Sequence, residues 1–376
     1  MSGLGVALFI VALLLMILLH EAGHFFTAKR FGIKVEEFFV GFGPRLWSRR
    51  RGETEYGLKA LPLGGYVRIA GMNPFQEVPP EEQPRTFGAK PPWQRAIVLA
   101  AGSATHFLLA IALLWGFFTF VGVPVLGRPV VAQVEETLEG QRSPAAEAGL
   151  RTGDEILRAN GERIDDNPEL IRITRGAVGE EVELVVRRSE ERLTVSVTPI
   201  PSEVNGEEVG RLGVVLTQDV AGRDREDPFA AVGRGATTTG EITVRSFQAL
   251  GQIFSPSGLS RIGQLITGEA EREVTDPTGI VGAGRLAGQA ASSGNADQLL
   301  LFLAALNVFI GILNILPLPP LDGGHLAVLT WEKVTGRSVD VRRLIPLTAA
   351  VLGILILLTL SLTWLDVVSP VPNPFR

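Results

Sequence analysis

Residues 3–30 read GLGVALFIVALLLMILLHEAGHFFTAKR, a largely apolar stretch near the start of the chain. It carries no charge from Gly3 to Leu19 and closes with two basic residues, Lys29 and Arg30. At 1.5 Å per residue, a helix of this length extends roughly 35–40 Å, which is enough to cross a hydrocarbon core of about 30 Å. The sequence therefore predicts a membrane-spanning helix over about residues 4–28.

Three ionisable residues, His20, Glu21 and His24, interrupt this apolar stretch. The two histidines are four residues apart and share one helical face, and Glu21 between them can reach a water molecule at the same ion. Ionisable groups inside a membrane are costly and are functional by default. A signal peptide is disfavoured, because the segment lacks a basic start and a small-residue cleavage site. The HExxH spacing predicts a zinc site.

Composition limits the protein class. The chain has 376 residues and 46% hydrophobic content, which is too apolar for an ordinary soluble enzyme and too long for one domain. A formal charge of −5 gives no reason to expect a nucleic-acid partner. With no cysteine, a metal site must use histidine and carboxylate ligands. All four histidines fall in or beside apolar segments: His20, His24, His106 and His325.

Three further apolar segments follow, at about residues 96–123, 299–316 and 344–365. We therefore expect a polytopic α-helical membrane protein with about four transmembrane helices. Basic residues gather in the first and third connections, so the positive-inside rule places these connections in the cytoplasm and both termini outside. They are Lys34, Arg45, Arg49, Arg50, Arg51, Lys59, Arg68, Arg85 and Lys90 in the first connection, and Lys333, Arg337, Arg342 and Arg343 in the third.

The first connection contains a predicted cytoplasmic-side β-hairpin at about residues 54–70. Residues 55–61 read as one strand, and Pro62 to Ile69 read as a turn and a second strand. A sheet edge beside a metal site can hold an extended peptide backbone by strand addition. A small hairpin that only caps the helices fits these residues equally well.

The long middle connection has the pattern of a folded extracytoplasmic domain. Alternating strands at residues 181–186 and 193–197 follow a Gly-Asp turn at Gly153 and an Asn-Gly turn at Asn160. This pattern resembles bacterial PDZ domains over residues 128–200, which implies an inserted α+β barrel that captures peptide ends. Residues 201–297 are then a linker with amphipathic helices. The apolar spacing at residues 228–267 fits an interfacial helix or a second soluble helix.

A catalytic zinc needs a third protein ligand and one open position. The third span ends in NILPLPPLDGGH, residues 314–325, where prolines break the helix. Irregular backbone at membrane depth is tolerated only against protein or a water-filled cavity, so this segment is expected to face an interior site. Asp322 offers the third ligand. With the predicted topology, it reaches the same cytoplasmic depth as the HExxH residues.

Together, HEAGH on the first span, the PLGGYV hairpin, the PDZ-like insert and the NxxPxPxLDGG stretch resemble the site-2 protease family of intramembrane zinc metalloproteases. The resemblance covers nearly the whole chain and favours the bacterial members with a single PDZ domain. It implies that His20, His24 and Asp322 bind one Zn²⁺ and that Glu21 is the general base. It also implies that Asn314 helps to bind the substrate carbonyl or its oxyanion.

The same resemblance implies hydrolysis of peptide bonds within or near transmembrane segments of single-span membrane proteins, such as membrane-bound anti-sigma factors. The protein is expected in the bacterial inner membrane, with termini and PDZ domain extracytoplasmic and the site near the cytoplasmic side. The hairpin residues Gly64, Gly65 and Tyr66 are expected to bind substrate. Two alternatives are a non-catalytic membrane PDZ scaffold and a metal transporter, although transport needs ligands along a path.

The second span departs from the family pattern. Many relatives carry Gly-Pro-x-x-Asn there, whereas this chain reads Gly102-Ser103-Ala104-Thr105-His106. His106 either hydrogen-bonds to a ligand or the substrate, or is a satisfied buried histidine. His325 is expected beside the metal rather than on it, because a fourth protein ligand would leave no room for water.

Overall fold

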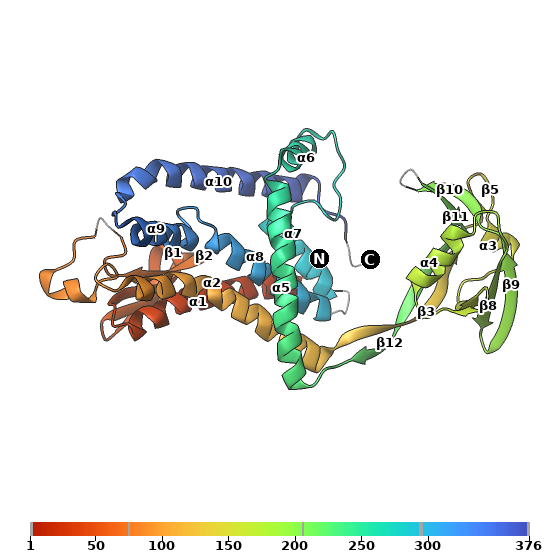
Figure 1. Ribbon diagram of the computed structural model, residues 1–376, viewed down its shortest axis with the longest axis horizontal. Helices are drawn as coiled ribbons and strands as arrows, with labels where there is room; N and C mark the ends of the chain where they lie inside the picture. The colour runs from red at the N-terminus through yellow and green to blue at the C-terminus, as the bar shows by residue number, and fades with distance from the viewer. Residues whose placement is uncertain (1–2, 74–75, 205–206, 293–295, 374–376) are drawn as a thin grey trace. The chain divides into compact units, whose positions relative to one another are not determined.

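The computed structural model describes residues 3–73, 76–204, 207–292 and 296–373. The chain divides into two compact units. Unit 1 comprises Met1–Phe120 and Asp227–Arg376, and unit 2 comprises Val121–Glu226. Unit 2 is therefore an insertion between two halves of unit 1, as the colouring along the chain in Figure 1 shows.

Unit 1 is mainly helical. Its described helices are α1 (Gly3–Arg30), α2 (Pro92–Gly116), α5 (Pro228–Ile253), α6 (Pro256–Thr267), α7 (Ile280–Ser292), α8 (Ala296–Ile315), α9 (Asp322–Thr335) and α10 (Ile345–Val368), with 3-10 turns at Pro80–Arg85 and Val341–Leu344. Helices α1, α2 with its π-helical turn Phe117–Val121, α8 and α10 are long and apolar enough to cross a membrane. The four predicted apolar helices are confirmed.

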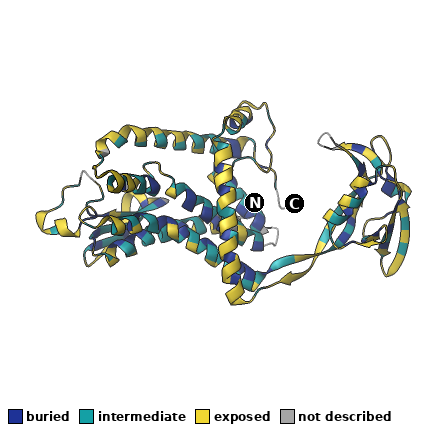
Figure 2. Ribbon diagram, viewed as in Figure 1, coloured by how far each residue is buried: buried dark blue, intermediate teal, exposed yellow. Residues whose placement is uncertain are grey.

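Helix α2 is central to unit 1 and packs against α1, α5, α8 and α9. Its buried residues recur every one, three or four positions, which places them on one broad helix face: Val98, Leu99, Gly102, Ser103, His106, Ala110 and Leu114. Much of the remaining surface of the apolar helices is exposed, and Figure 2 shows this most clearly for α10. Such apolar surface suits contact with lipid.

The predicted hairpin at residues 54–70 has a different pairing. Strand β2 (Thr54–Ile69) contains both expected strands, but they pair with β1 (Val35–Arg51). Phe39 has Gly57 as a register partner on one side and Tyr66 on the other. The two expected strands therefore flank the start of β1 and do not form a hairpin with each other. This correction arises because β1 was not predicted from its sequence.

Helix α5 packs on the apolar helices of unit 1, crosswise to α2 in Figure 1. Buried small residues on one face, including Ala231, Gly235 and Thr239, allow a close approach. A Cβ at Gly235 would lie 3.2 Å from the Ile111 carbonyl oxygen. Apolar side chains outside this face, such as Phe229 and Phe247, are exposed. Helices α5 and α6 cover most of residues 228–267, and the interfacial and soluble interpretations of this segment both stay predictions.

Unit 2 contains a six-stranded sheet with the order β12-β3-β6-β8-β9, and β7 pairs with β6. Smaller ladders join β4 to β5 and β10 to β11. The described elements are β3 (Val123–Val134), β4 (Thr137–Leu138), β5 (Gln141–Arg142), α3 (Pro144–Glu147), β6 (Glu155–Ala159), β7 (Glu162–Arg163), α4 (Asn167–Gly176), β8 (Val182–Arg188), β9 (Glu191–Val197), β10 (Ile200–Val204), β11 (Glu207–Arg211) and β12 (Val214–Asp224).

The core of unit 2 consists of inward-facing aliphatic residues such as Ile156, Leu184 and Val186. Strand β12 returns to pair with β3, so the sheet continues beyond the predicted domain end at residue 200. Residues 201–226 therefore belong to the folded unit and not to a linker. The sequence boundary was wrong because β12 finds its partner about ninety residues upstream.

Candidate metal centre

Helix α1 presents His20 and His24 one turn apart on the same face, as their four-residue spacing requires. Their Nε2 atoms lie 3.2 Å from each other. His24 is buried, and its Nδ1 donates a hydrogen bond to the Val98 carbonyl oxygen of α2 at 2.8 Å. A metal-binding histidine is commonly oriented by such a bond from its other ring nitrogen.

Asp322 is the first residue of α9. The two glycines after it let the start of α9 pack against the end of α8 and the turn that follows it. A Cβ at Gly323 would lie 2.1 Å from the Ile315 carbonyl oxygen, and one at Gly324 would lie 2.5 Å from the Pro319 nitrogen. The LDGG sequence therefore has a steric reason, since any larger residue at either glycine would displace Asp322.

The three side chains meet at one point. Asp322 Oδ2 lies 3.4 Å from His20 Nε2 and 3.2 Å from His24 Nε2. Zinc bonds of 2.0–2.1 Å in a tetrahedron place neighbouring ligand atoms about 3.3–3.4 Å apart. The three distances fit that geometry, and the Asp322 Oδ2 atom is buried without a hydrogen-bond partner. These residues therefore suit a zinc ion.

Glu21 lies beside this cluster and interacts electrostatically with His20, His24 and Asp322. The Val67 backbone of β2 also lies close to its carboxylate. A Cβ at Gly65 would lie 3.2 Å from Glu21 Cγ, so β2 passes directly over this side chain. The structure thus brings the predicted base and the predicted substrate-binding strand together.

The other predicted site residues lie outside the cluster of His20, His24 and Asp322. Tyr66 stacks on Phe39 and donates a hydrogen bond to Glu37, so its ring is held within the sheet. Gly64 is buried against Phe42. Asn314 is half-buried near the end of α8, and its predicted role stays a prediction. His325 is exposed on α9 and is not part of the cluster formed by the three ligands.

Two residues beside the cluster were not singled out as functional from sequence. A Cβ at Gly102 would lie 2.2 Å from His24 Nε2 and 2.6 Å from His20 Cε1, so only glycine lets α2 approach the imidazoles. Asn307 of α8 is fully buried, and its Oδ1 lies 3.1 Å from His106 Nδ1. A polar residue within an apolar span was the available signal for Asn307.

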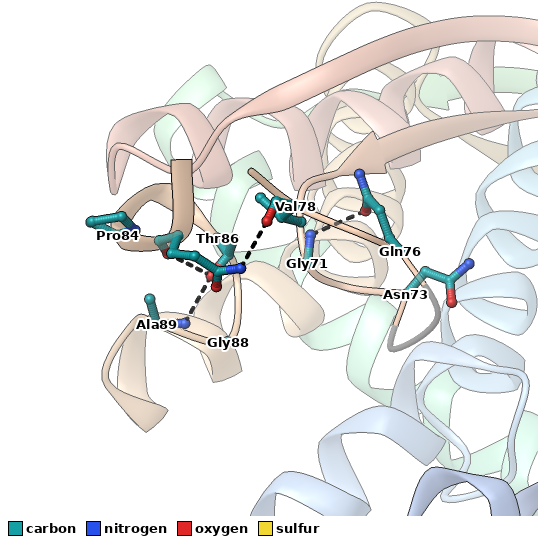
Figure 3. Close-up of a pocket in the computed structure, with 9 residues that line it drawn as sticks. Gly71, Asn73, Gln76, Val78, Pro84, Thr86, Gly88 and Ala89 are labelled. Carbon is teal, nitrogen blue, oxygen red and sulfur yellow. Dashed lines mark hydrogen bonds between the residues drawn. The ribbon is translucent and has the colours of Figure 1, made fainter. Parts of the chain in front are cut away.

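A separate pocket of about 580 Å³ lies in the connection between β2 and α2 (Figure 3). Hydrogen bonds connect residues that line this pocket. The Gln83 side-chain amide donates to the Val78 carbonyl, and the Gly71 backbone amide donates to the Gln76 side chain. None of the described residues that line it is a histidine or carboxylate. This pocket therefore lacks the ligands that a zinc ion requires.

Comparison with known proteins identifies the family. The model of peptidase family M50 matches residues 8–360. The zinc metalloprotease Rip1 of Mycobacterium tuberculosis is 34% identical over 403 aligned residues that cover 98% of both chains. A putative zinc metalloprotease of Nostoc sp. is 33% identical over 340 aligned residues, covering 89% of this chain and 87% of the relative.

Among solved structures, the PDZ domain of the SdrC-like protein of Listeria monocytogenes pairs with 24% of this chain and 86% of its own, at 20% identity and a TM-score of 0.21. That score is too low to establish the fold of unit 2.

The family match covers both halves of the candidate metal centre, and both relatives align over most of this chain and of their own. The chain therefore belongs to peptidase family M50 and is a zinc metalloprotease.

Proposed function

We propose that His20, His24 and Asp322 hold the catalytic zinc and that Glu21 is the general base for peptide-bond hydrolysis. One observation carries this proposal: donor atoms from α1 and α9 form a triangle with sides of 3.2–3.4 Å. Helix α1 is also apolar enough to span a membrane, where three such groups would be costly without an ion to bind.

A zinc ion bound there supplies Lewis acidity for attack on a peptide carbonyl. Glu21 takes the proton of the attacking water and passes it to the leaving amine, because it lies beside the three ligands. Asn314 donates a hydrogen bond to the developing oxyanion. These assignments leave one position beside the three protein ligands open for the reaction, as a catalytic zinc site needs.

The proposed substrates are single-span membrane proteins, cleaved within or near the transmembrane segment. Backbone amides in a membrane helix are hidden by helical hydrogen bonds, so the substrate must be held extended before attack. The segment Gly65–Ile69 pairs with β1 along one edge, and no described strand pairs with its other edge. The contact between Val67 and Glu21 supports strand addition at that edge.

We propose that unit 2 is a PDZ domain that receives peptide ends. A cavity of about 230 Å³ lies between α4 and the β11–β12 turn. Leu170, Leu212 and Leu216 make its lining apolar, and Arg175 and Arg211 add positive charge. An apolar C-terminal side chain with its free carboxylate has matching chemistry.

The proposed location is the bacterial inner membrane, with both termini and unit 2 outside the cytoplasm. The basic residues in the connections at residues 31–91 and 316–344 support this orientation through the positive-inside rule. The metal centre then lies toward the cytoplasmic side. Cysteine labelling from outside spheroplasts, with single cysteines in unit 2 and in the connection before α2, tests this orientation.

Glu21→Gln in the full chain tests the catalytic assignment. The variant keeps the three proposed ligands, so it is expected to retain zinc while cleavage of a single-span test substrate falls by about 100-fold or more. His325→Gln is the matched control, since it changes a nearby residue outside the cluster. Equal cleavage by Glu21→Gln and the parent chain would remove Glu21 as the base.

A further inference from the structure

The two proposed histidine ligands have different surroundings. His24 uses Nε2 in the cluster and donates from Nδ1 to the Val98 carbonyl at 2.8 Å. His20 also uses Nε2 in the cluster, but its Nδ1 is buried without a hydrogen-bond partner. Histidine ligands almost always donate their second ring N–H to a carboxylate, a carbonyl or water. His20 therefore needs an acceptor that its own helix does not supply.

The ring of His106 lies beside that of His20. Its ring centroid lies 5.1 Å from that of His20, with the ring planes inclined at 37°. His106 is only 2% exposed, and its Nδ1 lies 3.1 Å from Asn307 Oδ1. Since Nδ1 is engaged by Asn307, Nε2 is the one ring nitrogen left for another partner.

The hydrogen bonds of Asn307 decide which nitrogen of His106 carries the hydrogen. Asn307 Nδ2 donates to the Leu303 carbonyl oxygen one turn earlier, at 2.9 Å. The opposite amide orientation would place two oxygens against each other, so Oδ1 must face His106. Because Oδ1 only accepts, His106 Nδ1 must donate. A neutral His106 ring then presents Nε2 as an acceptor.

We propose that His106 is a positioning residue that accepts the Nδ1–H of His20 when the zinc is bound. The two ring centroids are 5.1 Å apart, and Asn307 fixes the tautomer that makes His106 an acceptor. The resulting chain of hydrogen bonds runs from His20 through His106 and Asn307 to the Leu303 carbonyl. In this chain the hydrogen bond to His106 orients the His20 ring, as the hydrogen bond to the Val98 carbonyl orients the His24 ring. This inference rests on the proposed zinc ligands.

Zinc affinity of the purified full chain, measured by competition with a chromogenic chelator, tests the proposal. His106→Phe keeps a ring but removes the acceptor, and is expected to weaken zinc binding by about 10–100-fold. The zinc affinity of His106→Gln is expected to stay within about threefold of that of the parent chain. Its amide N–H can donate to Asn307, and its carbonyl can accept from His20. His325→Phe is the matched control and should change nothing.

Asn307→Leu provides an independent test that leaves His106 in place. Without the fixed tautomer, zinc binding is expected to weaken by at least about threefold, and the visible spectrum of the cobalt-substituted protein is expected to change. Zinc affinity within twofold of the parent chain in folded His106→Phe or in Asn307→Leu overturns the proposal. His20→Ala separates this outcome from a wrong metal site, because complete zinc retention in His20→Ala would remove the ligand assignment itself.

Discussion

Gly102 of α2 lies so close to His24 that a Cβ on Gly102 would stand 2.2 Å from the Nε2 atom. The same Cβ would stand 2.6 Å from Cε1 of His20. The backbone of the central helix of unit 1 therefore forms one wall of the proposed metal centre. This contact holds both imidazoles between α2 and Asp322, and it requires glycine at this position.

Gly102→Ala is expected to disrupt the metal centre. The added methyl group must push the imidazoles aside, and overpacking of this kind costs about 1–3 kcal/mol, which corresponds to a loss of about 5- to 150-fold in zinc affinity. The measurement is zinc affinity together with cleavage of a single-span substrate. Gly116→Ala on the same helix is the control, because a Cβ there meets nothing within 4 Å. Equal zinc affinity in both variants would contradict the steric role of Gly102.

Asp154 and Arg188 form a partly buried ion pair in unit 2. Asp154 is fully buried and accepts hydrogen bonds from Arg188 Nε at 2.8 Å and Nη2 at 2.7 Å. Burial opposes ionisation, but the bonds from Arg188 and the Arg151 amide outweigh it and hold the pKa of Asp154 below its usual value. Asp154→Asn is expected to cost unit 2 about 1–3 kcal/mol at pH 7, with allowance for the partial exposure of Arg188.

The pH dependence of this cost follows from the lowered pKa. The pair contributes fully above the unfolded pKa of about 3.9, and its contribution is lost as pH falls through the lower folded pKa of Asp154. The difference between parent and Asp154→Asn is therefore expected to shrink below pH 4. Pulse proteolysis of the full chain in urea, followed through fragments of unit 2, measures it. A constant difference from pH 7 to pH 3 would rule out this account.

Asp366 and Arg272 tie the end of α10 to the segment before α7. Asp366 is fully buried and accepts from Arg272 Nη2 at 3.1 Å and from the Gly282 amide at 2.6 Å. Asp366→Ala leaves the Arg272 charge buried, at a cost of about 3–5 kcal/mol, so thermal unfolding is expected roughly 10 °C lower. The double variant Arg272→Met with Asp366→Leu removes the buried charge but leaves the Gly279 and Gly282 amides without their acceptor, so it is expected to regain only part of this loss. Unchanged unfolding of Asp366→Ala would refute the role of this pair.

Peptide binding by unit 2 is expected to need a free carboxylate. A fluorescent peptide with an apolar C-terminal residue should bind the full chain, and its C-terminal amide should bind at least about tenfold more weakly, since a charged hydrogen-bonded partner is lost. Arg211→Gln is expected to weaken binding of the acid and leave that of the amide unchanged. Fluorescence polarisation provides the measurement. Equal binding of acid and amide would count against the proposed groove.

Sequence alone predicts the four apolar helices and brings Asp322 to the HExxH motif. The apolar length and the helical spacing of a segment are local properties of the chain. The third predicted span ends on the same side of the membrane as the HExxH motif, so its end is expected at the same membrane depth as the motif. The likeness of the LDGG stretch to the family then selects Asp322. The structure adds the steric reason for its glycines, Gly323 and Gly324.

The remaining features depend on contacts between distant segments. The partners of residues 54–61 and 65–69 lie in β1, and β12 returns to β3 across most of unit 2. No local pattern reveals such pairing. Gly102 and Asn307 act across neighbouring helices, and the His106–Asn307 contact joins residues 201 positions apart. A single glycine or asparagine in a span has no spacing to mark it.

Elemental analysis of the purified full chain after dialysis measures whether α1 and α9 bind one zinc ion together. We expect about one zinc ion per chain in the parent protein and in His325→Ala. We expect almost none in His20→Ala and in Asp322→Ala, because each variant lacks one of the three proposed ligands. One zinc ion per chain in Asp322→Ala would contradict the claim that these two helices share the metal.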